Sequence, residues 1–241
     1  MKTYGIKKEG YQINSFNKSM EDSDGKRFWN FWHTLLAKKA QYYVYELAYQ
    51  LAVKHNLSTV LDVGCGIGRM LKKFFKDGFR VYGIDQPSGI KECTAILPAG
   101  IFLVDNIASA NYKMKEYLKT SPLIICADVI EHLDDPDQIL DYIQAFCDKD
   151  TLVVISTPER AAIAGKDNKK PNNPYHVREW AFHEFKEYIA QAGFEIVEHT
   201  LVRPGRFCFD LGTALYIVEK SLSGLPLKQT QVVVCRLKQP Y

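Results

Sequence analysis

The sequence lacks several features that would assign it quickly to a class of protein. Its six cysteines form no Cys-x-x-Cys pair, so we expect reduced, buried cysteines rather than a thiolate zinc site. It has no run of about 18 apolar residues, which argues against a membrane-spanning helix. Met1–Gly10 contains no apolar signal core, so we expect a cytoplasmic protein rather than an exported one.

An excess of charge of one sign is also lacking. The 241 residues include 31 Lys and Arg and 28 Asp and Glu, which gives a formal net charge of +3. A balance this close to neutral does not predict a surface dedicated to nucleic acid. Hydrophobic residues make up 46% of the chain and charged residues 24%, which is typical of a globular protein and excludes a fibrous or disordered one.

Short apolar runs alternate with helical patterns through most of the chain. The runs are continuously apolar, which is typical of strands buried on both faces of a parallel sheet. Regular alternation of strands and helices predicts an α/β fold, doubly wound, with helices on both faces of the sheet. The seven expected strands are 59–63, 80–85, 101–105, 123–127, 151–156, 194–202 and 231–237, and the clearest helices between them are 70–76, 136–147 and 178–191.

The chain divides into an N-terminal helical arm and a longer domain. Residues 1–56 begin polar and become helical in pattern from Phe28 to His55, so we interpret them as an arm with a helical cap. Residues 57–241 hold all the expected strands. Within this domain, residues 203–228 are too long for a hairpin turn and are interpreted as an insertion.

The most distinctive feature is a glycine-rich turn after the first expected strand. The segment 60–68 reads Val-Leu-Asp-Val-Gly-Cys-Gly-Ile-Gly. Glycine lets the backbone approach a ligand closely, and the carboxyl ends of strands are where open α/β sheets bind ligands. The dinucleotide fingerprint G-x-G-x-x-G is absent, because Arg69 occupies the position of its third glycine. Asp62 adds a negative charge beside the turn, which suits a cationic ligand better than a pyrophosphate.

Acidic residues also close the next two expected strands. Asp85 ends the second strand, about 20 residues after the first glycine of the turn, where an acid can accept both hydroxyls of a ribose. Asp105 ends the third strand, although an Asp that initiates a turn is common at such a position.

These segments resemble class I S-adenosylmethionine-dependent methyltransferases over roughly Leu57 to Glu198. The resemblance implies S-adenosyl-L-methionine as the cofactor, S-adenosyl-L-homocysteine as its product, and a Rossmann-like, mostly parallel seven-stranded sheet with the last strand antiparallel. In that family the acid and glycines of the turn hold the aminocarboxypropyl end of the cofactor, the second acid holds the ribose, and the third accepts from the adenine amino group. The implied cofactor-binding residues are Asp62, Gly64, Cys65, Gly66, Asp85, Gln86, Asp105, Asn106, Ile107, Asp128 and Val129.

Two histidines near the later strands are the candidate catalytic residues. His132 ends the segment Asp-Val-Ile-Glu-His after the fourth strand, which resembles motif IV of a large methyltransferase branch. His176 lies in Asn-Pro-Tyr-His-Val-Arg-Glu-Trp, which resembles a stretch in small-molecule, glycan and quinone methyltransferases. A neutral histidine can take a proton from a hydroxyl nucleophile near neutral pH. The alternative is structural: His132 organises its loop, and His176 is a helical residue hydrogen-bonded to Glu179.

The same region resembles small-RNA 2′-O-methyltransferases, in which an acid, a Glu-His pair and a later His bind a divalent metal. The matching positions are Asp128, Glu131, His132 and His176. Two carboxylates and two imidazoles are a reasonable set for Mg²⁺, Mn²⁺ or Zn²⁺. Asp128 stands where the RNA enzymes carry a longer Glu, so a metal is not the favoured interpretation.

We therefore expect an enzyme that methylates a small-molecule acceptor, at a hydroxyl oxygen, such as a sugar, a nucleotide-linked glycan precursor or a quinone. Arg203 and Arg206 are candidates to bind a carboxylate or phosphate on that acceptor. A metal-using RNA 2′-O-methyltransferase and a non-catalytic cofactor-binding scaffold are the alternatives, and the near-neutral charge disfavours nucleic acid as a partner. The sequence leaves a second subunit open, with the aromatic-rich arm as its contact.

Overall fold

The structure is a computed structural model that describes residues 41–107, 111–168, 170–171, 173, 175–206 and 211–239. The N-terminal part of the arm, with most of its aromatic residues, lies outside this range. The division of the chain at residue 56 stays a prediction.

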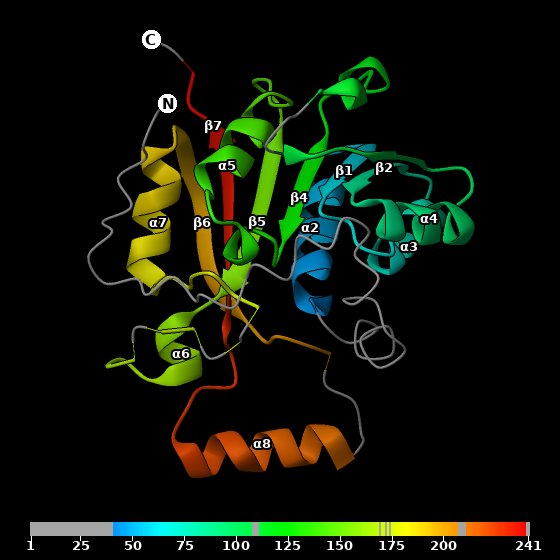
Figure 1. Ribbon diagram of the computed structural model, residues 1–241. Helices are drawn as coiled ribbons and strands as arrows, with labels where there is room; N and C mark the ends of the chain where they lie inside the picture. The colour runs from blue at the N-terminus through cyan, green and yellow to red at the C-terminus, as the bar shows by residue number, and fades with distance from the viewer. Residues whose placement is uncertain are drawn as a thin grey trace.

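The core of the molecule is one seven-stranded sheet in the order β3-β2-β1-β4-β5-β7-β6 (Figure 1). Strand β7 pairs antiparallel with both of its neighbours, and the other strands all run in one direction. The expected α/β sheet with an antiparallel last strand is therefore confirmed. The strands are β1 (Thr59–Val63), β2 (Arg80–Asp85), β3 (Ile101–Val104), β4 (Leu123–Ala127), β5 (Leu152–Pro158), β6 (Phe194–Val202) and β7 (Thr230–Leu237).

Helices cover both faces of the sheet, as the uniformly apolar strands require. Side chains of α2 (Tyr42–Lys54), α3 (Lys72–Lys76) and α4 (Pro87–Ile96) belong to one buried apolar cluster. Those of α5 (Asp137–Gln144) and α7 (Phe182–Gln191) belong to a second cluster on the other face. Because β1 and β4 lie between these clusters, every residue of both strands is buried.

Helix α4 was not expected from the sequence, and the reason lies in its first turn. Pro87 occupies the first helical turn, and Gly89 follows two residues later, and both residue types have low helix propensity. A Cβ at Gly89 would lie 2.7 Å from the carbonyl oxygen of Gly66. The glycine that weakens the helical pattern is thus the residue that lets α4 pack against the glycine-rich turn.

The expectation that a helix begins at Arg178 is wrong, because α7 begins at Phe182. The carbonyl oxygen of Trp180 accepts hydrogen bonds from the Arg160 amide at 3.0 Å and from the Gln231 side chain at 2.8 Å. Trp180 also forms an isolated parallel bridge with Glu159. These tertiary hydrogen bonds keep the segment before α7 extended against its helical pattern.

The remaining elements are short apart from one helix. The 3-10 turns η2 (Arg69–Leu71), η4 (Lys113–Glu116) and η5 (Ile130–His132) follow β1, β3 and β4, and the short helix α6 (Arg160–Ala164) follows β5. None of the helices in the described ranges is long and apolar enough to cross a membrane.

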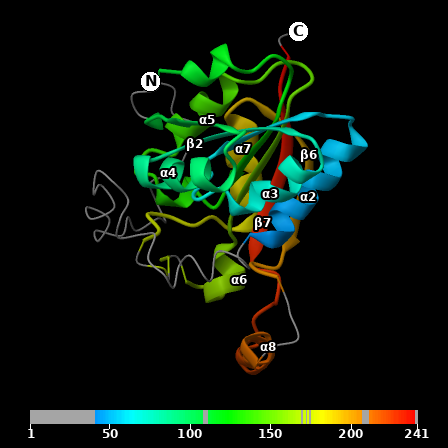
Figure 2. The ribbon, with the colours of Figure 1, turned by 90° about the vertical axis from the view of Figure 1, so that its right-hand side faces the viewer.

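The insertion before β7 contains α8 (Leu211–Ser223), which both ribbon views place beyond the ends of β6 and β7 (Figures 1 and 2). Its apolar residues Leu215, Val218 and Leu222 are exposed, whereas Tyr216 and Lys220 are half-buried. The Tyr216 hydroxyl donates to Gln229 Oε1 at 2.9 Å. The helix therefore turns polar residues toward the body of the protein and an apolar stripe away from it.

The glycine-rich turn between β1 and η2 depends on left-handed backbone. Gly64, Gly66 and Gly68 have φ angles of +84°, +54° and +69°. A Cβ at Gly64 would lie 2.3 Å from Cγ2 of Val129, a β-branched residue that follows β4. The turn is therefore packed against the neighbouring strand end so closely that only glycine fits.

This packing predicts unequal costs for two alanine substitutions at similar φ. Gly78 has a φ of +88°, but nothing lies within 4 Å of an added Cβ, so Gly78→Ala adds backbone strain alone. We expect Gly78→Ala to cost about 1 kcal/mol and Gly64→Ala, which adds a clash, about 2–4 kcal/mol. Urea denaturation of both variants measures the difference, and equal costs would show that Val129 does not confine the turn.

Candidate functional site

The side chain of Asp62 lies at the centre of the candidate site. It is fully buried near the end of β1, and its Oδ2 accepts a hydrogen bond from the Tyr45 hydroxyl at 2.8 Å. Its Oδ1 is buried without a hydrogen-bond partner among the described residues. Burial raises the pKa of Asp62 to about 7, although the Tyr45 hydrogen bond opposes the shift.

Asp85 connects the end of β2 to the glycine-rich turn. Its Oδ2 accepts from the Gly66 amide and its Oδ1 from the Gln86 amide, both at 2.6 Å. Burial raises the pKa of Asp85, and these two amide hydrogen bonds lower it. Gln86 is the residue before α4, so one carboxylate ties the turn to the start of that helix.

Asp105 lies just after β3 and is bound on both oxygens. Its Oδ2 accepts from the Tyr142 hydroxyl at 2.8 Å, and its Oδ1 accepts from the Asn106 amide at 2.9 Å. Asn106 is exposed, and Ile107 packs against the apolar cluster beneath α5. Both oxygens of Asp105 therefore accept from the protein, and Oδ2 has a second lone pair for a further donor.

Asp128 follows β4 in left-handed conformation, with a φ of +54°. Its Oδ1 accepts from the Ser156 hydroxyl at 2.7 Å, and its amide donates to the Ser156 carbonyl at 3.1 Å. Burial raises its pKa, and the Ser156 hydrogen bond lowers it. The adjacent Val129 lies over Gly64, so these two residues join the end of β4 to the turn.

The four acids thus lie at the carboxyl ends of four adjacent strands, β3, β2, β1 and β4. The sequence predicted this arrangement, and the structure brings the four strand ends to one edge. A concentration of carboxylates beside open glycine backbone suits a ligand with a positive charge and several donors. The unpartnered Oδ1 of Asp62 fits the ammonium group of the cofactor that the sequence implies.

Glu131 is the most deeply buried acid of the segment after β4. Its Oε2 accepts from the Thr157 hydroxyl at 3.0 Å, and its Oε1 has no partner among the described residues. Burial raises the pKa of Glu131 well above its usual range. Its backbone carbonyl also accepts from the Val177 amide at 2.8 Å, which holds the loop before α7 against η5.

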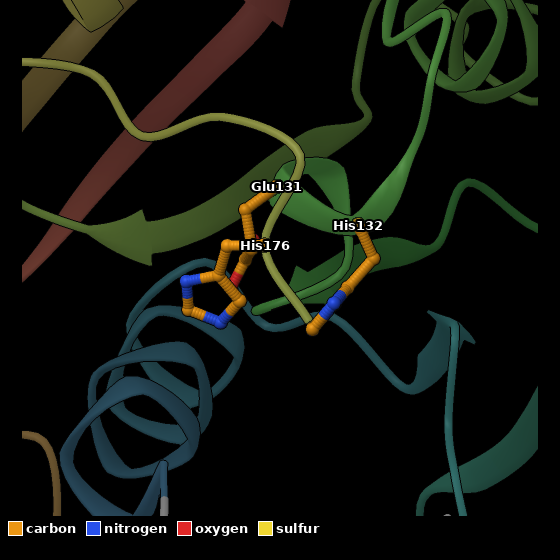
Figure 3. A group of neighbouring side chains, drawn as sticks. All are labelled: Glu131, His132 and His176. Atoms are coloured by element: carbon orange, nitrogen blue, oxygen red, sulfur yellow. The ribbon is translucent and has the colours of Figure 1, made fainter. Parts of the chain in front are cut away.

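His132 and His176 meet edge to face, with ring centroids 4.8 Å apart. Figure 3 shows that Glu131 and His132 come from one short turn and His176 from the loop that passes beside it. His132 Nδ1 lies 2.8 Å from the carbonyl oxygen of Tyr175, which only accepts, so Nδ1 carries the proton and Nε2 the lone pair. Burial lowers the pKa of His132 to about 4, so its neutral form dominates at pH 7.

His176 is held differently. Its Nδ1 lies 2.6 Å from Oε1 of the buried Glu179, and its Nε2 lies 2.9 Å from the amide nitrogen of Asn173. Nδ1 therefore donates to the carboxylate, and the Nε2 lone pair accepts from Asn173. The expectation that His176 is helical is wrong, because it precedes α7, but its contact with Glu179 is present.

Three of the four expected metal ligands come together. The ligand atoms of Glu131, His132 and His176 lie within 4.8 Å of one another. Asp128 is not part of this group. The set offers a buried carboxylate oxygen on Glu131, whereas the His176 lone pair is already used by Asn173. It therefore fits a divalent metal only in part.

Several residues that support the site were missed by the sequence analysis. Tyr45, Tyr142, Ser156 and Thr157 each donate a hydroxyl hydrogen bond to one of the site acids. Because they lie in apolar helices and strands, the sequence predicts them to be core residues. The one available signal was that β5 ends in Ser-Thr-Pro, which places hydroxyls at the same edge as the acids.

Arg203 and Arg206, the expected acceptor-binding pair, lie beside the first turns of α2. The guanidinium of Arg206 lies 5.0 Å from the ring centroid of Tyr42, and that of Arg203 lies 6.0 Å from the ring centroid of Tyr43. Between them, the Pro204 carbonyl accepts from the Gln41 amide at 2.9 Å. These contacts place both arginines against aromatic rings of α2.

The buried charge on Asp62 predicts a pH-dependent gain in stability for Asp62→Asn, which keeps an acceptor for Tyr45. The folded-state pKa of about 7 lies above the ordinary value of 3.8, so ionisation of Asp62 lowers stability as pH rises between these values. We expect Asp62→Asn to be more stable than the natural protein by about 1–3 kcal/mol at pH 8, with a smaller difference at pH 5. Denaturant unfolding at both pH values measures this, and a difference independent of pH would contradict it.

Comparison with known proteins identifies the family. A family model described as a methyltransferase domain matches residues 31–199. The ubiquinone biosynthesis O-methyltransferase of Shewanella sp. (strain ANA-3) is 32% identical over 93 residues, which cover 37% of this chain and 37% of the relative. A probable S-adenosylmethionine-dependent methyltransferase of Mycolicibacterium smegmatis is 30% identical over 160 residues, which cover 65% of this chain and 60% of the relative.

The matched segments thus span less than two thirds of each curated relative. The structure of the plantazolicin methyltransferase BpumL in complex with SAH shares the fold, with a TM-score of 0.61 at 13% identity over 94% of this chain and 95% of that chain. Because the family model covers more than half of the sequence, the chain belongs to the methyltransferase-domain family, and its sheet has the fold of class I S-adenosylmethionine-dependent methyltransferases.

Proposed function

We propose that this methyltransferase acts on a hydroxyl oxygen of a small-molecule acceptor, with His132 as the proton acceptor. The observation that carries the proposal is the neutral His132, with its lone pair on Nε2, at the strand edge that holds the four acids. A hydroxyl must lose its proton as its oxygen attacks the methyl carbon, and a neutral imidazole can take that proton.

The cofactor supplies an activated methyl group on a positively charged sulfur. We propose that Asp62 binds its ammonium group, and that Gly64, Cys65 and Gly66 let the backbone approach its amino-acid end. Asp85, with Gln86, would accept from the ribose hydroxyls. The positive φ angles at Gly64 and Gly66 and the buried, half-satisfied carboxylate of Asp62 support this placement.

The end of β3 would hold the adenine. Asp105 accepts from its own loop and from Tyr142, which fixes the carboxylate for one more donor from the adenine amino group. Asn106 and Ile107 would flank the ring, and Asp128 with Val129 would close the opposite side. Ile107 and Val129 are both half-buried apolar residues, which suits contact with a heterocycle.

His176 has a supporting role in this proposal. Its lone pair accepts from Asn173 and its proton is held by Glu179, so its nitrogens are engaged within the protein. Its ring packs edge to face on His132 and confines the ring of the proton acceptor. His176 therefore helps to orient the reacting groups and does not itself act as an acid or a base.

Similarity to two ubiquinone biosynthesis O-methyltransferases supports an oxygen acceptor. Either is matched over less than half its length, so the acceptor is proposed as a chemical class, a hydroxyl on a sugar, a quinone precursor or a similar small molecule. Arg203 and Arg206 would bind a carboxylate or phosphate of that acceptor. The near-neutral charge of the chain disfavours an RNA acceptor.

A metal-dependent reaction is the second candidate. The unpartnered Oε1 of Glu131, buried beside two imidazoles, is the observation that favours it. A divalent ion there would neutralise Glu131 and lower the pKa of the attacking hydroxyl. The hydrogen bond from Asn173 to Nε2 of His176 argues against a full ligand set.

A screen of methyl acceptors with purified protein and labelled S-adenosylmethionine tests the proposal. It should begin with thermal-shift titration of S-adenosylmethionine and S-adenosylhomocysteine. We expect both to raise the melting temperature and hydroxyl acceptors to be labelled. A protein stabilised by neither would contradict a catalytic role, and label found only on amine acceptors would contradict the choice of oxygen.

Removal of the proposed proton acceptor predicts a kinetic defect. We expect His132→Ala to lower kcat by about 10²–10⁴-fold while the Kd of S-adenosylhomocysteine changes little, because the imidazole acts on the acceptor. His183→Ala, at an exposed position of α7, is the matched control and should keep full activity. Full activity in His132→Ala would refute the assignment.

Treatment with EDTA separates the two candidates. If the protein's own residues remove the proton, chelated and dialysed enzyme should keep its rate. Activity lost with EDTA and restored by Mg²⁺, Mn²⁺ or Zn²⁺ would favour the metal-dependent reaction instead. Glu131→Gln, compared with the natural protein at each metal concentration, identifies whether the ion binds at this group.

A further inference from the structure

One hydroxyl group connects helix α2 to the carboxylate at the centre of the site. Tyr45 and Asp62 are both buried, and the tyrosine donates to Oδ2 at 2.8 Å. The other oxygen of Asp62 is buried with no hydrogen-bond partner in the described part of the chain. The protein thus holds this carboxylate through one of its two oxygens.

We propose that Tyr45 is the positioning residue for Asp62: its hydroxyl orients the carboxylate and keeps it ionised for the ammonium group of the cofactor. The inference rests on the proposed function, because it takes Asp62 as the partner of that ammonium group. It makes cofactor binding depend on a residue outside the glycine-rich turn, since Tyr45 belongs to α2, the helix that precedes β1.

The main chain of Asp62 is held by the sheet, so only its side chain needs a further residue to orient it. Asp62 is paired on both sides within the sheet, with Gly83 of β2 and Ile125 of β4, so its main chain is fixed. Helix α2 is anchored beside it by the fully buried Val44 and Ala48 on either side of Tyr45. A rigid donor on a rigid helix therefore determines which oxygen of Asp62 stays available.

The charges around Asp62 make this donor important. Burial raises the pKa of Asp62, and the carboxylate of Asp85 at the end of β2 raises it further. Among the described residues, Asp128 after β4 and the thiols of Cys65 and Cys126 also interact electrostatically with Asp62 or Tyr45, and none of these three groups is a cation. The Tyr45 hydrogen bond opposes these effects and favours the carboxylate form.

The test measures the Kd of S-adenosylhomocysteine by calorimetry between pH 6 and 8.5. The natural protein should bind more tightly as pH rises through 7, because Asp62 ionises there. We expect Tyr45→Phe to weaken binding about 10- to 100-fold at pH 7 and to move the midpoint of the pH dependence up by about one unit. A merely structural role for the ring would leave that midpoint in place.

Tyr49→Phe is the matched control. Tyr49 lies one turn later on the same helix, and its hydroxyl donates to the exposed Asp77 at 2.7 Å. This variant loses the same atom from the same helix without touching Asp62. It should keep the natural Kd and midpoint.

A double-mutant cycle covers the case in which Tyr45→Phe disturbs the fold. If Tyr45 acts through Asp62, adding Tyr45→Phe to Asp62→Asn should leave the Kd of Asp62→Asn unchanged. An unchanged Kd or midpoint in Tyr45→Phe, or an equal loss in both backgrounds, would overturn the inference. Failure of the natural protein to bind S-adenosylhomocysteine at any pH would instead overturn the proposed function, and this inference with it.

Discussion

A carboxylate removed from water at the end of a central strand is the constraint on which the site depends. Asp62 is enclosed by β2, β4 and α2, and a buried carboxylate is tolerated only where donors or a cation compensate for lost hydration. Within the described part of the chain, one donor binds this carboxylate and its other oxygen has no partner. The resulting local instability is of the kind that proteins retain where a ligand completes the interaction.

The other acids also lie at strand ends, and Asp85 and Asp105 accept more hydrogen bonds from the protein than Asp62 does. Asp85 is held by two backbone amides, Asp105 by an amide and Tyr142, and Asp128 by Ser156. Asp85 and Asp105 thus each accept from two of these donors, whereas Asp62 and Asp128 each accept from one side-chain hydroxyl. The neighbours of Asp62 are already oriented before any ligand arrives, which lowers the entropy that binding must overcome.

Much of the fold could be predicted because its signals are local. The strands β1, β2 and β4 were predicted with their observed bounds, since continuous apolar runs ending in glycine or acid mark buried strands. Helix α4 and the start of α7 could not be predicted, because the conformations of Gly89 and Trp180 depend on contacts with residues distant in the sequence. The site acids could likewise be predicted, because they follow recognisable strands. Their tyrosine and serine donors could not, because they lie on other elements and no sequence motif marks them.

The antiparallel strand β7 has a consequence for how the chain folds during synthesis. It lies between β5 and β6, so until the last part of the domain leaves the ribosome β6 has no sheet partner and β5 is paired on one side only, with β4. All residues of β5 except Pro158 are buried in the finished sheet, and until β7 is added this edge of β5 is open to pairing with another chain. Until β7 is added, the nascent chain therefore has an unpaired strand edge of the kind that makes partly folded chains prone to misassociation.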